Sequence, residues 1–373
     1  MSNKPHENWS SKIGFVLASL GSALGLGAMW KLPYVIGQNG GGAFLLLFIA
    51  FNFLIGFPLF VGEVSLGRRS QRGVVSSFST FSNAKKGWGI VGWLTVLVVF
   101  LILGWYCVVS GWALAYIVIA ITDSFRGLSA KEIATSFDYL REDFGLNLLF
   151  QAIFIALNAA ILNQGLNRGI ERYSKFMTTT LFIVLIGLCA FAIQLSGFEQ
   201  GLFYIIYPDF SKLSAEGVVQ ALALALFTLS VGYGANITYG AYLKSDADIL
   251  KMAAAVVCAN LLASVLIALT IFPMIFTFNF PPESGEGLIF KTLPFVFELL
   301  PGSMVLAAVF FTLLLFAALT SSIAMFEVAV LNLTDLFSID RKKAVLASAL
   351  LAFLLGIPVA LHKKKHFHLI RYQ

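Results

Sequence analysis

The sequence predicts an all-α membrane protein that crosses the bilayer about nine times, and two observations carry this prediction. Hydrophobic residues make up 59% of the 373 residues and charged residues only 12%, with a mean hydropathy of +0.88. Soluble domains average roughly 45–50% apolar and about 25% charged residues. Several stretches are also apolar and long enough to cross a bilayer. The composition argues against a soluble enzyme, a nucleic-acid-binding protein, a disordered chain and a coiled coil.

The expected membrane-spanning helices cover residues 13–37, 42–66, 89–121, 148–164, 176–196, 217–242, 249–280, 302–335 and 344–361. Helices are expected because only helices or closed barrels satisfy the backbone in lipid, and these runs are too long and too uniformly apolar for barrel strands. They form one membrane domain over residues 1–373, with a polar N-terminal segment at 1–12 that lacks the pattern of a cleavable signal. A basic tail covers residues 362–373.

The basic residues predict the orientation. Fifteen Lys and Arg residues fall on the side of the N-terminus and six on the other, which places the N-terminus in the cytoplasm. The tail then lies outside, yet it carries Lys363, Lys364 and Lys365. We therefore expect a truncated or frame-shifted end rather than a short natural tail. Without the tail the chain is nearly neutral, so its charge gives no reason to expect a nucleic-acid partner.

Two of the expected helices contain glycine clusters. Gly21, Gly25 and Gly27 lie in the first, and Gly232 and Gly234 lie in the sixth. For a single glycine, close packing between helices is the simpler interpretation. Interruptions at corresponding places of two halves instead indicate inverted repeats with a binding site between them. The half-helix N-terminus attracts an anionic group, and the freed carbonyls can hold a cation.

Polar side chains cluster near the same places: Ser22, Tyr106, Thr228, Ser230, Asn260, Thr320, Ser321 and Ser322. Hydroxyl, carbonyl and amide oxygens are suitable ligands for a hard cation such as sodium. The alternative for the Thr-Ser-Ser run is that its hydroxyls bond back to their own helix.

Five segments carry a family resemblance: SALGLGAMWKLPYVIGQNGGGAF, GEVSLGRRS, NQGLNRGIERYSK, FTLSVGYGANITYGAY and FAALTSSIAMFE. They resemble signatures of the neurotransmitter:sodium symporters, especially the bacterial amino-acid transporters with the leucine-transporter fold. The resemblance runs from about Trp9 to past Asp335. It implies an inverted repeat, with helices 1–5 at residues 13–196 and an incomplete second repeat, helices 6–9, at 217–361. The tenth helix of the family has no counterpart here.

The resemblance implies a sodium-coupled symporter of amino acids that works by alternating access in the inner membrane of a bacterium. No HExxH motif, paired Asp or P-loop appears in the sequence, so an enzyme is not expected. The alternative is a truncated remnant that binds but does not transport. The oligomeric state is left open.

The cation sites carry over from the resemblance. One sodium site would use the carbonyls of Gly21, Leu24 and Ala317 and the hydroxyls of Thr320 and Ser321. A second, weaker site would use Ala23, Thr228 and Asn260, because Ala28 stands where the family usually has Asn. Chloride is not expected, since Phe48 and Leu224 replace polar ligands, although Ser264 is suitable.

The substrate site carries over as well. Leu26, Gly27 and Tyr106 would hold a carboxylate. An ammonium would lie among Ala23, Phe227 and Thr228, with Ser230 nearby. The side-chain pocket would be lined by Ile102, Phe227, Tyr233, Ser321 and Met325. Monoamine-type relatives have Asp at the position of Gly25, so glycine there favours an amino acid, and the apolar walls favour an apolar or aromatic side chain.

The resemblance also implies two gates. Lys31 matches the basic outer-gate position, while Tyr242 and Asp335 match the inner gate, where His6 replaces an Arg. Glu63 is expected to brace the cytoplasmic helix ends near Arg68. Glu327 lies within an expected span, and acids there are costly and often functional. It is either a proton carrier or a hydrogen-bonded structural residue.

Overall fold

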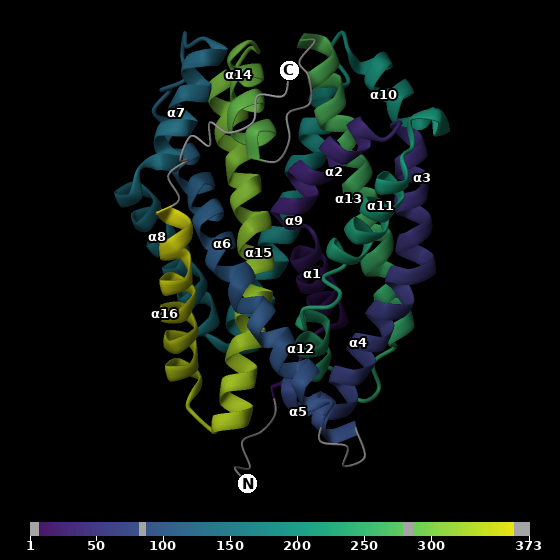
Figure 1. The fold of residues 1–373 in the computed structure, drawn as a ribbon, viewed down its shortest axis with the longest axis vertical. Helices are drawn as coiled ribbons and strands as arrows, with labels where there is room; N and C mark the ends of the chain where they lie inside the picture. Colours follow the sequence, from purple (N-terminus) through teal and green to yellow (C-terminus); the bar gives the residue numbers. More distant parts are fainter. Residues whose placement is uncertain (1–6, 82–86, 279–285, 362–373) are drawn as a thin grey trace, which may run out of the picture.

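The computed structural model describes residues 7–81, 87–278 and 286–361 as helices and connecting segments, with one isolated bridge between Gly41 and Pro208. Long helices run side by side along the longest axis of the molecule (Figure 1). Seven are apolar and long enough to cross a membrane, and one bent pair brings the number to eight within the described residues. The all-α membrane architecture is as predicted.

The uninterrupted spans are Gly42–Ser70, α6 (Gly89–Ile121), α8 (Phe144–Leu162), Leu166–Ala192, α13 (Ile249–Phe278), α15 (Ser303–Phe337) and α16 (Arg341–Ala360). The first of these joins α3 (Gly42–Phe51), the π-helix η1 (Asn52–Gly56) and α4 (Phe57–Ser70). The fourth joins the π-helix η2 (Leu166–Glu171) to α9 (Arg172–Ala192).

Two predicted spans are interrupted. The first consists of α1 (Lys12–Ala23) and α2 (Leu26–Gln38), which bend by 54° at the break. The predicted span 217–242 is divided into α11 (Ala215–Phe227) and α12 (Ala235–Ala241), so neither half is long enough to cross lipid alone. The span predicted at 176–196 starts at Leu166 in the structure, ten residues earlier. The prediction began too late because the first turns of the helix are basic and have low hydropathy.

Short helices connect the spans. They are α5 (Val74–Phe81), α7 (Ala130–Glu142), α10 (Phe198–Ile206), η3 (Phe210–Lys212), η4 (Leu288–Thr292) and α14 (Leu293–Glu298). Helix α7 begins with a capping box, in which Ser129 and Glu132 bond each other's backbone. The hydrogen bonds from Ser129 hold the pKa of Glu132 below its ordinary value.

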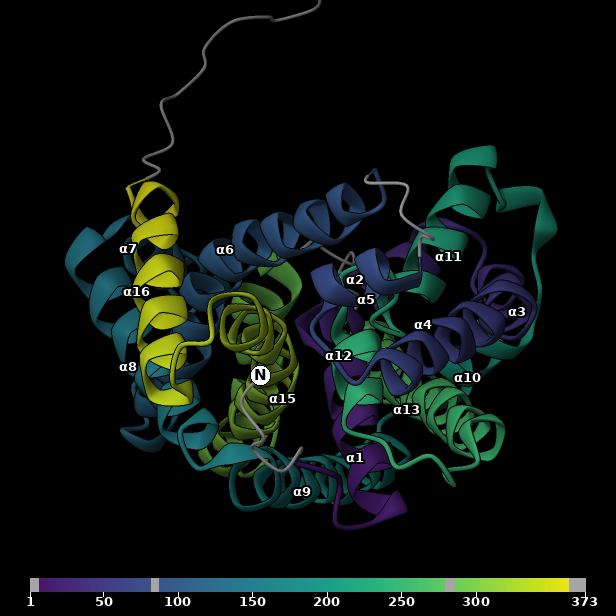
Figure 2. The same cartoon turned by 90° about the horizontal axis from the view of Figure 1, so that it is seen from below.

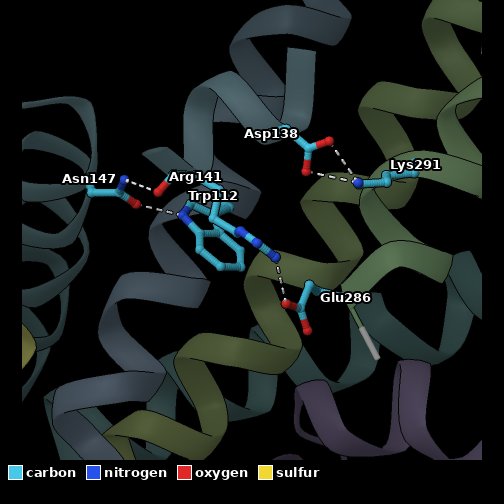
Figure 3. Close-up of polar contacts among 6 residues, drawn as sticks. All are labelled: Trp112, Asp138, Arg141, Asn147, Glu286 and Lys291. Atoms are coloured by element: carbon cyan, nitrogen blue, oxygen red, sulfur yellow. Dashed lines mark hydrogen bonds and ion pairs between the residues drawn. The ribbon is translucent and has the colours of Figure 1, made fainter. Parts of the chain in front are cut away.

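Two ion pairs fasten α7 to the segment before α14 (Figure 3). Lys291 Nζ lies 2.8 Å from Asp138 Oδ1, and Arg141 lies 3.3 Å from Glu286 Oε1. In addition, the Tyr116 hydroxyl on α6 donates to the Phe290 carbonyl at 2.7 Å. This segment is therefore attached to the part of the bundle that α6 and α7 form.

The bundle brings the interrupted spans together. Helix α6 packs against α15, α16 and α8, while α1 packs against α9, α13 and α15. Seen along the long axis, the short helix α12 lies between α4 and α15 (Figure 2). Both breaks are therefore enclosed by long helices, where irregular backbone is tolerated in a membrane protein.

Candidate functional site

The first break lies at Leu24 and Gly25, between α1 and α2. The Leu24 N–H still donates to the Leu20 carbonyl, which closes α1. A Cβ atom on Gly25 would lie 2.6 Å from Ser321 Oγ and 3.1 Å from Tyr106 Oη. The break therefore needs glycine because α6 and α15 bring two hydroxyls against the backbone.

The second break covers residues 228–234, between α11 and α12. Ser230, Gly232 and Gly234 have φ angles of 56°, 98° and 83°. Glycine adopts this left-handed region without steric cost, whereas serine is held there by its surroundings. The Asn236 side-chain amide donates to the carbonyls of Leu229 and Ser230 at 3.0 and 3.1 Å. This amide gives the unwound carbonyls the partners that a continuous helix would have supplied.

Glu63 on α4 supports the second break. Its carboxylate accepts from the Gly232 N–H at 2.9 Å and from the Asn236 amide at 3.0 Å. Arg68, near which Glu63 is expected to brace the helix ends, donates to the Ala247 carbonyl at 2.7 Å, whereas these hydrogen bonds of Glu63 are to the start of α12. Glu63 thus fixes the backbone on which part of the predicted substrate site is built.

A cavity of about 380 Å³ lies at the two breaks, between α6 and α15. Its lining residues are Ser22, Ala23, Gly25, Leu26, Gly27, Leu101, Ile102, Trp105, Tyr106, Phe227, Tyr233, Ser321 and Met325. At its polar end the Leu26 N–H donates to the Tyr106 hydroxyl at 3.3 Å. The cavity therefore combines an apolar wall with a backbone donor and a phenol at the start of α2.

Two predicted substrate residues, Thr228 and Ser230, do not line the cavity. Thr228 is fully buried and accepts from the Asn260 amide at 3.3 Å. The Ser230 hydroxyl lies 3.0 Å from the Ser22 hydroxyl, which does line the cavity. Both therefore lie behind the wall. All other predicted substrate residues are in the wall.

Four wall residues were not predicted as substrate ligands: Ser22, Gly25, Leu101 and Trp105. Leu101 and Trp105 lie next to Ile102 and Tyr106 on one face of α6, at the i, i+4 spacing of a helix. This spacing is visible in the sequence and could have identified them once Tyr106 was placed in the site.

The oxygens predicted for the first cation site lie together between α1 and α15. The Thr320 hydroxyl is 2.8 Å from the Gly21 carbonyl and 3.1 Å from the Ala317 carbonyl. The Ser321 hydroxyl is 3.3 Å from the Gly21 carbonyl and 2.8 Å from that of Ser22. These neutral oxygen ligands suit a hard monovalent cation. Each hydroxyl could rotate its proton away from the neighbouring carbonyl and present a lone pair to the ion. The fifth predicted ligand, the Leu24 carbonyl, belongs to the residue that ends α1 at the break.

The second predicted cation site has fewer oxygens. Asn260 is fully buried on α13, and its side-chain carbonyl oxygen has no hydrogen-bond partner in the described part of the chain. An unpaired buried acceptor beside Thr228 fits a cation ligand. Ala28, also buried, contributes only a methyl group. The donor set therefore fits an ion less completely than the first site does.

Of the three positions compared with the chloride site of the family, two are apolar. Phe48 and Leu224 are buried, and the Ser264 hydroxyl donates to the Asn260 carbonyl at 2.9 Å. The Ser264 proton is thus already used inside α13.

The predicted gate residues have separate surroundings. Lys31 is exposed on α2, with no hydrogen-bond or ion-pair partner among the residues that the structure describes. The Tyr242 hydroxyl donates to Glu327, whereas the Asp335 carboxylate accepts from the Gly73 N–H at 3.2 Å. Tyr242 and Asp335 therefore belong to two different contacts. His6 lies outside the described residues.

Glu327 is fully buried on α15 and forms a two-pronged ion pair with Arg341, at 2.9 and 2.7 Å. Arg341 also donates to the Leu162 carbonyl at 2.9 Å. Such a fork satisfies both oxygens of a carboxylate. Of the two alternatives for Glu327, these contacts support the structural one.

The N-terminal segment is tied to the bundle by residues that the sequence did not reveal. The Trp9 N–H donates to the Tyr242 carbonyl at 3.1 Å, and its indole N–H donates to the Tyr239 carbonyl at 2.9 Å. Glu171 on η2 accepts from the Ser10 N–H at 2.8 Å and from Lys175 at 2.6 Å. Glu171 lies in the quoted segment NQGLNRGIERYSK, but nothing in that segment indicated its partner in the first residues.

Comparison with known proteins matches residues 6–137 and 141–368 to the sodium:neurotransmitter symporter family. The chain belongs to this family. An uncharacterized sodium-dependent transporter of Bacillus subtilis, YhdH, is 40% identical over 97% of this chain and 80% of its own length. One from Haemophilus influenzae is 35% identical over 96% of this chain and 81% of its length.

A solved structure of a symporter-like fold agrees with this assignment. The crystal structure of MhsT in complex with L-phenylalanine superimposes with a TM-score of 0.88 at 36% identity, covering 96% of this chain and 81% of MhsT. The predicted family and leucine-transporter fold are confirmed. The symporter is a multi-pass membrane protein of a sodium-dependent transporter family and not an enzyme, also as predicted.

Proposed function

We propose that this symporter couples sodium entry to the uptake of amino acids with apolar or aromatic side chains, by alternating access. One observation carries the proposal. The break between α1 and α2 presents the Leu26 N–H to a cavity that also contains the Tyr106 hydroxyl. The same break lies beside the oxygens of Gly21 and Thr320. A single interruption therefore offers donors to an anion and acceptors to a cation.

The donors suit a carboxylate. The first N–H groups of a helix have no partner within it, and the helix dipole favours negative charge there. In α2 these groups belong to Leu26 and Gly27. Gly25 cannot supply an acid to pair with an amine, so a substrate with its own carboxylate fits better. Its ammonium group would lie at the Ala23 and Phe227 carbonyls, and the second lone pair of the Phe227 oxygen would bind it, because the first accepts from the Ser230 N–H at 3.0 Å.

The rest of the cavity suits an apolar side chain. Leu101, Ile102, Trp105, Phe227 and Met325 provide its apolar surface. Pockets of this size and character hold small ligands through a few polar groups and an apolar wall. The related MhsT was crystallised with L-phenylalanine, which has both a carboxylate and an aromatic side chain.

Sodium at the α1/α15 oxygens would join the two helices, whereas its release would free α1. An ion shifts a conformational equilibrium only if it binds one state more tightly. The site at Ala23, Thr228 and Asn260 is proposed as a weaker second site. Residues 13–196 and 217–361 are the proposed repeats, with the N-terminus in the cytoplasm of a bacterial cell.

Equilibrium binding to the purified protein tests this function. Radiolabelled L-phenylalanine should bind in sodium chloride and in sodium gluconate but not in potassium chloride. Phenethylamine, which lacks the carboxylate, should compete poorly. Binding that is equal in potassium, or competition by phenethylamine at the level of phenylalanine, would contradict the proposal.

A further inference from the structure

A second cavity, of about 520 Å³, lies where the N-terminal segment meets α9. It is lined by Ser10, Asn167, Glu171, Arg172, Lys175, Phe176, Thr179 and Thr180. None of these residues lines the substrate cavity. Helix α9 lies at the rim of the bundle, beside α1 and α15 (Figure 2). The cavity is therefore at the edge where the protein meets lipid.

The one acid in this cavity is already neutralised. The Glu171 side chain is only 1% exposed. It accepts from the Ser10 hydroxyl at 2.6 Å, the Ser11 hydroxyl at 3.0 Å and the Lys175 ammonium at 2.6 Å. Charge-assisted hydrogen bonds of this kind use up the carboxylate's acceptor sites. Glu171 therefore presents no free negative charge to a bound molecule.

The two basic side chains that line the cavity have N–H groups that are not used in hydrogen bonds to the described residues. Lys175 is 35% exposed and uses two of its three protons, on Glu171 and on the Ser11 hydroxyl at 2.8 Å. Arg172 is exposed and has no hydrogen-bond or ion-pair partner among the described residues. Arg168, one turn earlier on the same face, likewise has none in the described part of the chain. The cavity is thus positively charged and has N–H donors that no described residue satisfies.

Along α9 the wall of the cavity changes from a basic side chain to an aromatic ring and then to two hydroxyl groups. Arg172, Phe176, Thr179 and Thr180 lie on one helical stripe, at the spacing i, i+4, i+7 and i+8. Phe176 is 61% exposed. Thr179 lies about 10 Å beyond Arg172 along the helix. The two threonine hydroxyls have no hydrogen-bond partner among the residues described.

We propose that this cavity binds the phosphate headgroup of an anionic phospholipid. Arg172 and the free proton of Lys175 bond the phosphate, since a guanidinium fork matches phosphate oxygens. The hydroxyls of Thr179 and Thr180 donate to the glycerol ester oxygens deeper in the leaflet, and Phe176 packs against an acyl chain. A free inorganic anion would use the arginine but would leave the apolar and threonine part of the stripe without a role.

Lipid titration of the intact protein tests the proposal. The chain is purified in a neutral detergent and titrated with dioleoyl phosphatidylglycerol, and bound lipid is counted by native mass spectrometry. We expect one tight equivalent for the unmodified chain and about tenfold weaker binding for Arg172→Gln, as expected for a lost charge-assisted contact. Thr179→Val should also weaken binding. Lys343→Gln, an exposed cation at the start of α16, is the matched control and should change nothing.

Two competitors separate the possible ligands. Dioleoyl phosphatidylcholine and inorganic phosphate should not displace the bound lipid. Displacement by inorganic phosphate would assign a soluble anion to the cavity and overturn the lipid proposal. Equal binding by Arg172→Gln, Thr179→Val and the unmodified chain would overturn it as well. If the glutamine variant fails to fold, Arg172→Lys keeps the test open, because it retains the charge without the fork and should bind more weakly than arginine. The result does not depend on amino-acid transport.

Discussion

The hydroxyl of Thr320 on α15 lies 2.8 Å from the carbonyl oxygen of Gly21 on α1, although 299 residues separate them in the chain. One oxygen belongs to the last turn of α1 before its break, and the other to a long unbroken helix. A cation bound between them would take ligands from both. Its presence would therefore favour the arrangement in which α1 rests against α15.

The first prediction removes two hydroxyls from this site. Thr320→Ala combined with Ser321→Ala leaves the carbonyls of Gly21 and Ala317 in place. Each lost ligand to a charged group should cost about 1–3 kcal/mol, so a sodium titration of substrate binding should shift by at least about tenfold. Ser322→Ala is the control, since its hydroxyl bonds Asn158 on α8 at 2.7 Å. A sodium dependence unchanged in the double variant would refute the site.

The second prediction concerns the carboxylate. Tyr106→Phe removes the hydroxyl that the Leu26 N–H faces, and amino-acid binding should weaken by about 1–3 kcal/mol. Tyr116→Phe is the matched control, because the Tyr116 hydroxyl donates to the Phe290 carbonyl and does not line the cavity. Competition binding in saturating sodium measures both variants. If Tyr106→Phe binds as tightly as the parent, the phenol is not part of the carboxylate site.

The third prediction tests the first break. Gly25→Ala would place a methyl group 2.6 Å from Ser321 Oγ, so the break or the hydroxyls must shift and substrate binding should be lost. Gly62→Ala on α4 is the control, because no atom lies within 4 Å of its added methyl. That control should keep full binding and gain up to about 1 kcal/mol in helix stability. Substrate-binding assays and thermal melting together distinguish a loss of binding from a loss of stability. Full substrate binding by Gly25→Ala would contradict the close approach of Ser321 to the first break.

The fourth prediction concerns the buried pair of Glu327 and Arg341. Arg341→Leu leaves a carboxylate buried without its partner, which should destabilise the fold by about 3–5 kcal/mol. Adding Glu327→Met to that variant should recover most of the loss, since a buried pair can be replaced by apolar residues at little cost. Thermal unfolding in detergent compares the variants. A double variant as unstable as the single one would show that more than the unpaired charge is lost.

The fifth prediction concerns orientation. Helix α7 and the start of α16 lie at opposite ends of the bundle (Figure 1). Lys131→Cys on α7 and Lys343→Cys in the first turn of α16 replace exposed residues with thiols. With the N-terminus in the cytoplasm, an impermeant maleimide should label the first in intact cells and the second only after permeabilisation. The reverse pattern would invert the assigned orientation. The parent chain, with its three native cysteines, gives the background.

Uniformly apolar helices could be predicted from the sequence almost to the residue. The expected helix at 89–121 coincides with α6, and that at 302–335 nearly coincides with α15. In contrast, α7 and α10 were missed because short amphipathic helices have too little apolar length for a hydropathy argument. The early start of the span at Leu166 was hidden by Arg168, Arg172 and Lys175. The boundaries of the two repeats stay a prediction.

The candidate site divides in the same way. Leu26 and Ser321 lie in a glycine cluster and a motif that are local in the chain, and Tyr106 was carried over from the family resemblance. The contacts of Glu63, Glu171 and Glu327 do not follow from local motifs, because each carboxylate bonds groups on elements distant in sequence. A buried acid in a membrane helix signals that a partner exists. Only the packing of the helices shows which partner it is.

Trp9 gives the interrupted spans a mechanical connection. Its backbone and indole N–H groups donate to the Tyr242 and Tyr239 carbonyls at the C-terminal end of α12, and it lies just before α1 begins. Trp9 thereby ties α1 to α12, which are the lower halves of the two broken spans in Figure 1. In the alternating access proposed above, a movement of α1 away from α15 would pull on α12 through Trp9, while α12 also packs against α4.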